Sequence, residues 1–355
     1  MRLLLVTNDY PPKPGGIQMY LGNLVSAYPD DVLVFAPADD AAPRDEVGVV
    51  RGSASYMLPT RALADEILAV AEPFAPDAVL FGAPHPLPRL GPTLREALGV
   101  PFGVLSHGAE VTLPAAMPGS RQLLAHMLRQ ADARFAVSRF TADRVERLTR
   151  RHTDFIGAGV EIDTFVPSSK PPTRARPVIG CVSRFVPRKG QDRLIEAVSR
   201  LDQDVEVLLV GKGRTEDSLR KLAHDRGVKA RFAVDVPWRD LPGLYQQMDI
   251  FCMPTSSRWG GLEVEGLGLV YLEAAASGLP VLAGDSGGSP ETVLPGRTGF
   301  VVADVEDVVE GLGLLLADPV RAVEMGAAGR AFVEAEFTWD RVVERLLDGF
   351  APHIG

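Results

Sequence analysis

The stretch Gly260-Gly-Leu-Glu-Val-Glu-Gly-Leu-Gly-Leu-Val-Tyr-Leu-Glu-Ala-Ala-Ala-Ser-Gly-Leu-Pro280 places acidic residues in a glycine-rich loop that runs directly into a short helix. The segment 269–277 consists of good helix formers, and the glycine and proline that follow it predict where the helix stops. Unpaired N–H groups and the positive end of the helix dipole would lie beside Gly268, Leu269 and Val270. This position favours binding of a phosphate group.

Two carboxylates of this stretch are candidates for ligand binding. Glu265 comes just before the helix, and Glu273 lies roughly 80° away from it on a helical wheel, so that both could face one ligand. The residues alone leave a second interpretation open, in which Glu265 complements the helix dipole and Glu273 is a solvated helix residue.

The composition is that of a globular protein large enough for two domains. The 355 residues are 46% hydrophobic and 23% charged, and a chain of this length more often folds as two domains than as one. The formal net charge of -9 argues against general binding to nucleic acid, because phosphate backbones attract basic surfaces.

No stretch of the chain is predicted to cross a membrane or to direct export. The apolar run 3–6 is too short for a signal peptide and is typical of a first strand, and no run approaches 18 apolar residues. Cys181 and Cys252 both lie in apolar runs, so we expect buried free thiols in a reducing compartment. These features predict a soluble cytoplasmic protein, which leaves room for a location at the inner face of the membrane.

Apolar runs alternate with helix-like segments in both halves of the chain. A proline-rich polar segment, 166–177, interrupts this pattern and is typical of an interdomain linker. The alternation predicts an α/β fold of two Rossmann-like, doubly wound parallel sheets with helices on both faces. In the first half the expected elements are strands 2–6, 32–36, 78–81, 102–105 and 134–137 and helices 17–27, 61–71 and 121–131.

Ligands of such sheets bind outside the carboxyl ends of the strands, and two loops of the first half carry candidate residues there. The loop after the first strand contains Gly15, Gly16 and Gln18, and His107 follows strand 102–105. A histidine at this place could donate a hydrogen bond to a sugar hydroxyl or to developing charge. The alternatives are a plain strand-to-helix turn and a structural histidine.

Two cations follow the first strand of the second half. Arg184 and Lys189 flank a loop at the carboxyl end of strand 178–183, where they could hold a diphosphate and neutralise its charge as it leaves. As isolated loop residues they would carry little information. Val236 occupies the equivalent place after strand 231–234.

Residues 119–152 are basic within an acidic protein. Eight arginines stand against three acidic residues, which gives this segment a charge of 8 - 3 = +5. Such charge runs are usually solvated faces. The alternative is a basic patch that contacts anionic lipid headgroups, as would suit an enzyme with a lipid acceptor.

The spacing Asp202-Gln-Asp204 is of the kind that metal-dependent transferases use. These residues precede a predicted strand and therefore lie at its amino end, away from the ligand side of the sheet. We interpret them as a surface turn and predict no metal and no other cofactor, with Arg184, Lys189 and the helix N-terminus neutralising charge instead.

These motifs together resemble one enzyme family. Glu265 and Glu273, with seven residues between them, are similar to the E-x7-E signature of retaining nucleotide-sugar glycosyltransferases of the GT4 type, which have the GT-B fold. The stretch Ser183-Arg-Phe-Val-Pro-Arg-Lys-Gly-Gln-Asp192 most resembles the GDP-mannose-dependent mannosyltransferases of phosphatidylinositol mannosides. The resemblance implies two domains facing across a cleft, 1–168 with helix 338–355 packed back on it and 169–337.

The resemblance also implies a role for each candidate residue. In such enzymes the second domain binds a nucleotide-sugar donor, here GDP-mannose, and the first supplies most of the site for a glycolipid acceptor. It implies catalytic roles for His107, Arg184, Lys189 and Glu265. Donor contacts would come from Gly16, Arg184, Lys189, Val236, Gly268, Leu269, Val270 and Glu273, and acceptor contacts from Gly15 and Gln18.

Three other functions stay open at this point. Related transferases use UDP- or ADP-sugars and soluble acceptors. A nucleotide-sugar epimerase of the same fold would need no acceptor, and the E-x7-E motif with the Arg and Lys pair argues against it. A two-domain sugar-binding protein without catalysis is usually exported, and this chain lacks the apolar run of a signal peptide.

Overall fold

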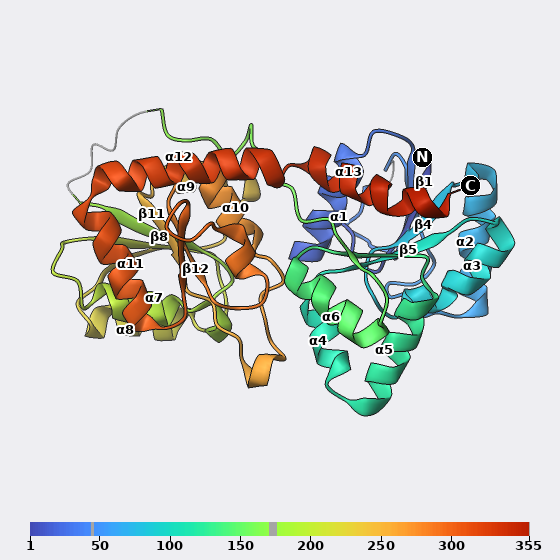
Figure 1. The fold of residues 1–355 in the computed structure, drawn as a ribbon, viewed down its shortest axis with the longest axis horizontal. Coiled ribbons are helices and arrows are strands. Elements are labelled where there is room, and N and C mark those ends of the chain that lie inside the picture. The colour runs from blue at the N-terminus through green and yellow to red at the C-terminus, as the bar shows by residue number, and fades with distance from the viewer. Residues whose placement is uncertain (44–45, 170–175, 355) are drawn as a thin grey trace. The chain divides into compact units, whose positions relative to one another are not determined.

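The computed structural model describes residues 1–43, 46–169 and 176–354, which fold as two compact units (Figure 1). Unit 1 comprises Met1–Gly159 and Trp339–Gly355, and unit 2 comprises Val160–Thr338. Half of the predicted linker 166–177, residues 170–175, lies outside the described residues.

Unit 1 is built on a seven-stranded parallel sheet with the order β3-β2-β1-β4-β5-β6-β7. Its strands are β1 (Leu3–Val6), β2 (Val32–Ala36), β3 (Val49–Arg51), β4 (Ala78–Phe81), β5 (Phe102–Ser106), β6 (Ala133–Ala136) and β7 (Asp154–Phe155). Its helices are α1 (Gly16–Ala27), α2 (Arg61–Phe74), α3 (Gly91–Leu98), α4 (Ala109–Ala115), α5 (Pro118–Gln130), α6 (Arg139–Thr149) and α13 (Trp339–Phe350).

Strand β1 sets the place of the ligand side of unit 1. All four of its side chains are buried, because helices cover both faces of the sheet. Leu3 pairs with Val32 on one neighbouring strand and with Ala78 on the other. The chain adds β2 and β3 on one side of β1 and then crosses to the other side to form β4, so the crevice between the carboxyl ends of β1 and β4 is a topological switch point.

Helix α13 returns the end of the chain to unit 1, where it lies beside α1 (Figure 1). The ring of Phe350 packs on Phe135 of β6 at 5.1 Å between centroids, and the indole of Trp339 packs edge-on against Tyr20 of α1 at 5.2 Å. These buried aromatic contacts attach α13 to the sheet of unit 1.

Unit 2 repeats the same plan with a six-stranded parallel sheet of order β10-β9-β8-β11-β12-β13. Its strands are β8 (Val178–Val182), β9 (Glu206–Val210), β10 (Lys229–Ala233), β11 (Ile250–Met253), β12 (Val281–Gly284) and β13 (Gly299–Val302). Its helices are α7 (Gln191–Val198), α8 (Glu216–Asp225), α9 (Leu241–Tyr245), α10 (Leu269–Ala276), α11 (Val305–Ala317) and α12 (Pro319–Glu336). The switch point of this sheet lies between β8 and β11.

The predicted fold class, two Rossmann-like parallel α/β units, is confirmed. Every strand expected in the first half is present within one or two residues of its predicted bounds. Strands β3 and β7 are not predicted from the sequence, because runs of three and two residues show no periodicity of their own.

Candidate active site

The loops after β8 and β11 meet at the switch point of unit 2. The loop after β8 ends in a short 3-10 turn, Pro187–Lys189, followed by Gly190 in the left-handed conformation with φ +74°. A Cβ at Gly190 would lie 2.1 Å from the carbonyl oxygen of Pro254, the first residue after β11. Only glycine permits this approach, so Gly190 brings Lys189 close to the loop that carries Glu265.

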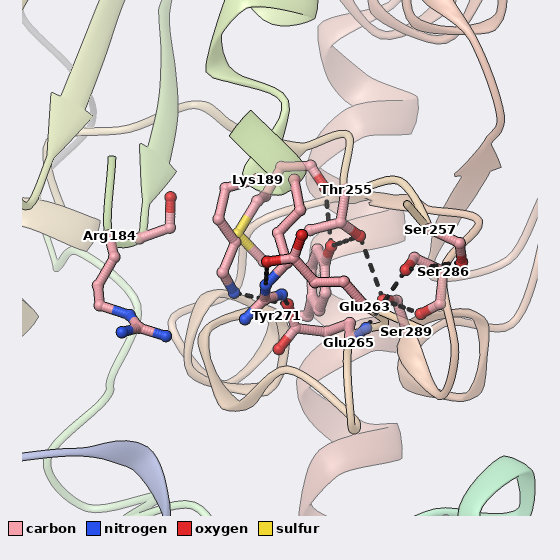
Figure 2. A network of polar contacts seen from close by, with 12 residues as sticks. Arg184, Lys189, Thr255, Ser257, Glu263, Glu265, Tyr271, Ser286 and Ser289 are labelled. Atoms are coloured by element: carbon pink, nitrogen blue, oxygen red, sulfur yellow. Dashed lines mark hydrogen bonds and ion pairs between the residues drawn. The ribbon is translucent and has the colours of Figure 1, made fainter. Parts of the chain in front are cut away.

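Two of the predicted residues, Lys189 and Glu265, form a buried ion pair (Figure 2). Nζ of Lys189 donates to Oε2 of Glu265 at 2.6 Å, and Nη1 of Arg188 donates to the same oxygen at 2.5 Å. Burial opposes ionisation of Glu265, but the two cations outweigh it and lower its pKa to about 2. Glu265 is therefore a carboxylate at neutral pH.

The ion pair extends to a second carboxylate. Nε of Arg188 lies 3.7 Å from Oε1 of Glu263, and Nη1 of Arg258 lies 3.7 Å from the other carboxylate oxygen of Glu263. Arg188 and Glu263 are not among the candidate residues predicted from the sequence. The signal that could have found them is an adjacent Arg-Lys pair on one loop of a switch point and a Glu-Val-Glu segment on the other.

The other predicted cation of unit 2, Arg184, stands apart from this cluster (Figure 2). Its side chain is exposed, and its guanidinium forms no hydrogen bond or ion pair within the described ranges. Arg184 can therefore engage a ligand without first leaving a partner.

The turn after β12 fixes the main chain of Glu265. The N–H of Gly288 donates to the carbonyl of Glu265 at 3.0 Å, and the N–H of Glu265 donates to Oγ of Ser286 at 3.3 Å. Gly287 has φ +61°, and a Cβ there would lie 2.0 Å from the carbonyl oxygen of Glu265. The turn that contains Gly287 and Gly288 thus fixes the position of the main chain at Glu265.

Buried hydroxyl groups support the same loop (Figure 2). The hydroxyl of Tyr271 donates to the carbonyl of Met253 at 2.7 Å and lies 3.0 Å from Oγ1 of Thr255. Ser289 extends this network by a contact of 3.3 Å to Thr255. Because these polar groups are buried and paired, they keep the loop in one conformation.

Glu273 makes a separate contact on helix α10. Its Oε2 accepts a hydrogen bond of 2.7 Å from the hydroxyl of Tyr245. Burial raises the pKa of Glu273 to about 7, and the hydrogen bond from Tyr245 only partly offsets this effect. The two carboxyls therefore differ in environment. Glu265 pairs with two cations, whereas Glu273 accepts a hydrogen bond from a phenol.

The N-terminus of α10 begins after Gly268, as the sequence predicted. Gly268 has φ +94°, and a Cβ there would lie 2.6 Å from the ring of Tyr271. The first two helical residues, Leu269 and Val270, are partly exposed, and no side chain caps the helix. Val236 lies in the loop after β10, where it is half-buried.

In unit 1 the loop after β1 carries the predicted Gly15, Gly16 and Gln18. Nε2 of Gln18 donates to Oδ1 of Asp9 at 2.7 Å, and a Cβ at Gly15 would lie 2.0 Å from Oε1 of Gln18. Gly16 begins α1, and a Cβ there would meet nothing within 4 Å. The side chain of Gln18 could move aside for a Cβ at Gly15, and the surface over Gly16 is open.

His107 lies at the switch point of unit 1. Its Nε2 is 2.9 Å from the carbonyl oxygen of Gly82, the residue that follows β4, so this nitrogen carries the proton and donates. The main-chain N–H groups of His107 and Gly108 both donate to Oε1 of Glu110. The ring also packs edge-on against Tyr20 at 5.2 Å. These contacts fix the ring and leave Nδ1 as a possible hydrogen-bond acceptor.

The basic segment of unit 1 forms a hollow between α5 and α6. The hollow has a volume of about 480 Å³ and is lined by four arginines, Arg121, Arg129, Arg147 and Arg150. Arg129 donates to the carbonyls of Leu148 and Thr149 at the end of α6. None of the four forms an ion pair with an acidic side chain in the part of the chain that the structure describes.

Several other expectations can be compared with the structure. Cys181 and Cys252 are buried free thiols, as predicted. Asp204 lies on the surface and pairs with Lys229 at 2.7 Å. Outside the segments 44–45 and 170–175, no three His, Cys, Asp or Glu side chains gather closely enough to hold a metal ion. Within the same ranges, no helix has both the length and the apolar character needed to cross a bilayer.

Comparison with protein families matches both parts of the chain. Residues 14–164 match the model described as Glycosyltransferase Family 4, and residues 165–332 match the model described as Glycosyl transferases group 1.

Two similar proteins align with nearly the full length of this chain. The GDP-mannose-dependent monoacylated alpha-(1-6)-phosphatidylinositol monomannoside mannosyltransferase of Corynebacterium glutamicum is 41% identical, over 97% of this chain and 96% of that protein. The GDP-mannose-dependent alpha-(1-6)-phosphatidylinositol monomannoside mannosyltransferase of Mycolicibacterium smegmatis is 40% identical, over 98% and 97%.

Among solved structures, Anabaena HepE in complex with UDP has a TM-score of 0.82, with 19% identity over 99% of this chain and all of that one. At this identity the likeness extends to the fold alone.

Proposed function

The chain belongs to glycosyltransferase family 4, and from this premise we propose that it transfers mannose from GDP-mannose to a hydroxyl of a phosphatidylinositol mannoside. This choice of donor and acceptor is supported by the 41% identity, over 97% of the chain, to the enzyme of Corynebacterium glutamicum. The name of that enzyme specifies GDP-mannose as the donor and phosphatidylinositol monomannoside as the acceptor. The chain is a glycosyltransferase, and its nucleotide-sugar and acceptor are the finer parts of this proposal.

The geometry of unit 2 supports a donor site at its switch point. Arg184 is exposed and unpaired among the described residues, and Lys189 lies further along the same loop after β8, where it pairs with Glu265. We assign these two cations to the donor diphosphate, together with the free N–H groups of Gly268, Leu269 and Val270 at the start of α10. Val236 would lie against the base, and Glu273 would accept a hydrogen bond from the ribose.

The proposed mechanism stabilises the leaving diphosphate rather than forming an enzyme–sugar bond. Transfer that retains the anomeric configuration through an enzyme–sugar bond needs two carboxyls about 5 Å apart, one of them a free nucleophile. Glu265 is bound by Lys189 and Arg188 instead, and Glu273 by Tyr245, so we assign Glu265 to the sugar hydroxyls. Charge on the leaving phosphate would be neutralised by Arg184 and Lys189, and the phosphate would accept the proton of the acceptor hydroxyl.

In unit 1 we assign His107 to a hydroxyl of the transferred sugar, Gly16 to the donor, and Gly15 and Gln18 to the acceptor. These assignments rest on the family resemblance. The fixed ring of His107 supports its part, because a preorganised hydrogen-bonding group loses no freedom on binding. No metal takes part in the proposed reaction, because cations and helix N–H groups fill that role.

We further propose that the arginines of 119–152 contact anionic lipid at the inner face of the membrane. The four arginines around the hollow have no acidic partner among the described residues, and two exposed apolar side chains, Met117 and Leu123, flank them. The Arg121→Gln/Arg150→Gln variant should bind vesicles of phosphatidylinositol about fivefold more weakly for each arginine lost. The exposed pair Arg297→Gln/Arg321→Gln is the control. Equal binding of all three proteins would contradict this contact.

The donor assignment is tested by thermal unfolding in the presence of nucleotides. A ligand at 100 times its dissociation constant adds about 2.7 kcal/mol of stability. GDP and GDP-mannose should raise the melting temperature more than UDP, ADP or their sugars do. A preference for UDP or ADP would contradict the mannose assignment. Turnover of the nucleotide-sugar without any acceptor would favour an epimerase.

A further inference from the structure

Arg188 and Lys189 bind the same oxygen of Glu265, although the two cations are held differently. Both donate to Oε2, and Oε1 accepts no hydrogen bond from a described residue. Arg188 also reaches Glu263, whereas Glu265 is the only carboxylate that pairs with Lys189 in the described ranges. A guanidinium that bridges two carboxylates is fixed, while an ammonium on a flexible stem is free to change partner.

The net charge of this cluster is positive by one unit, which favours binding of an anion. Three cations, Arg188, Lys189 and Arg258, face two carboxylates, Glu263 and Glu265, so 3 - 2 leaves one positive charge. Without Arg188 the sum would be zero, and Glu265 would repel a diphosphate as Lys189 turned toward it. The other titratable group facing Glu265 is the phenol of Tyr271 on α10, whose pKa burial raises, so it stays neutral.

We propose that Arg188 is a positioning residue that holds Glu265 ionised and in place when Lys189 leaves it for the donor diphosphate. Lys189 then serves two partners in turn: Glu265 in the donor-free protein and the diphosphate in the complex. Oε1 of Glu265 stays available to the sugar throughout, because Arg188 occupies only Oε2. This inference rests on the proposed function, since it assigns Lys189 to the donor phosphates.

The test compares Arg188→Gln and Arg188→Lys with the wild type over pH 5 to 8, with kcat and donor KM measured separately. Arg188→Gln should lose about tenfold or more in kcat, with a smaller change in KM, and its activity should fall at a higher pH on the acid side. Arg188→Lys keeps the charge but lacks the guanidinium that bridges Glu263 and Glu265, so it should restore the wild-type acid limb and only part of kcat. The control Arg220→Gln removes an exposed cation that pairs with Glu216, and it should match the wild type.

Binding of GDP gives a second readout that does not depend on turnover. Relative to the wild type, Arg188→Gln should bind GDP more weakly at pH 7.5 and should recover toward pH 5, where protonation of Glu265 removes the repulsion. A general loss of packing around Arg188 would weaken binding equally at both pH values.

Wild-type kcat, acid limb and GDP binding in a folded Arg188→Gln protein would overturn the proposal. A loss of activity and GDP binding in Arg188→Gln that does not depend on pH, and that Arg188→Lys does not restore, would also overturn it. If Arg188→Gln fails to fold, Arg188→Lys carries the test: an acid limb shifted to higher pH in that variant contradicts the proposal. If the wild type uses a UDP-sugar, the proposed donor is wrong, while the Arg188 comparison stands.

Discussion

Glu265 and Glu273 lie eight residues apart, and their surroundings shift their pKa values in opposite directions. The ion pairs with Lys189 and Arg188 lower the pKa of Glu265 to about 2 despite its burial, whereas burial raises the pKa of Glu273 to about 7. At neutral pH Glu265 is a fixed anion, and Glu273 is close to its titration point. Environments that separate the pKa values of neighbouring carboxyls are a feature of catalytic and binding sites.

Arg184 is expected to act on catalysis with little effect on stability. Its exposed side chain has no partner among the described residues, so Arg184→Ala should leave the melting temperature unchanged. Loss of one group that stabilises developing charge should lower kcat by about 100-fold or more. Steady-state kinetics and thermal unfolding of the same preparation measure both effects. Normal turnover in a folded Arg184→Ala protein would exclude the role that we assign to it.

Glu273 should make stability depend on pH. A carboxyl whose pKa is higher in the folded state stabilises the protein fully below its unfolded value of 4.5, and this contribution is lost as the pH rises through about 7. The shift corresponds to about 3 kcal/mol. Glu273→Gln keeps an amide oxygen for Tyr245 and should show a smaller fall in melting temperature between pH 5 and pH 8. The exposed Glu310→Gln is the control, and an unchanged pH dependence in Glu273→Gln would contradict the burial argument.

At the scale of elements, the turn after β12 positions the loop of Glu265 through its backbone. Gly287→Ala adds a Cβ that would lie 2.0 Å from the carbonyl of Glu265, at a residue with φ +61°. Gly296→Ala is a matched control, because Gly296 has φ +74° and open space around its Cβ. Both should lose about 1 kcal/mol of stability to the left-handed conformation. Only Gly287→Ala should also lose most of its turnover, and equal turnover in the two variants would show that the turn does not position Glu265.

The sequence predicted elements better than contacts between elements. Helix 269–277 was expected from its composition and the glycine and proline that follow, and α10 spans Leu269–Ala276. Lys189 and Glu265 were both named as candidates, yet their ion pair was not foreseen, because it depends on β8 and β11 being neighbours in the sheet. The same holds for Arg188, whose two carboxylate partners lie about 75 residues further along the chain.

At the scale of the whole molecule, each unit places its candidate residues at the switch point of its own parallel sheet. Unit 1 brings His107 to the carbonyl of Gly82, after β4, and unit 2 brings Lys189 to Glu265. The two sheets have the same strand order around their first strand, so each has a switch point where a ligand can bind. A transferase needs two such places, because it binds a donor and an acceptor.

The reaction is expected to proceed without a metal ion. In the proposed mechanism, Arg184, Lys189 and the N-terminus of α10 would supply positive charge to the diphosphate. Treatment with a chelator such as EDTA should therefore leave the initial rate unchanged, and added Mg²⁺ or Mn²⁺ should not raise it more than twofold. A rate that falls with chelation and returns with one metal would contradict this part of the mechanism.

The most direct test of the central claim is the initial rate of mannose transfer from GDP-mannose to phosphatidylinositol monomannoside, measured for the wild type and for Lys189→Ala. We expect the wild type to form a product one hexose larger than the acceptor. Lys189→Ala, checked for folding by its melting temperature, should lose about 100-fold or more in rate. No transfer by the wild type, or equal rates for the two proteins, would contradict the claim.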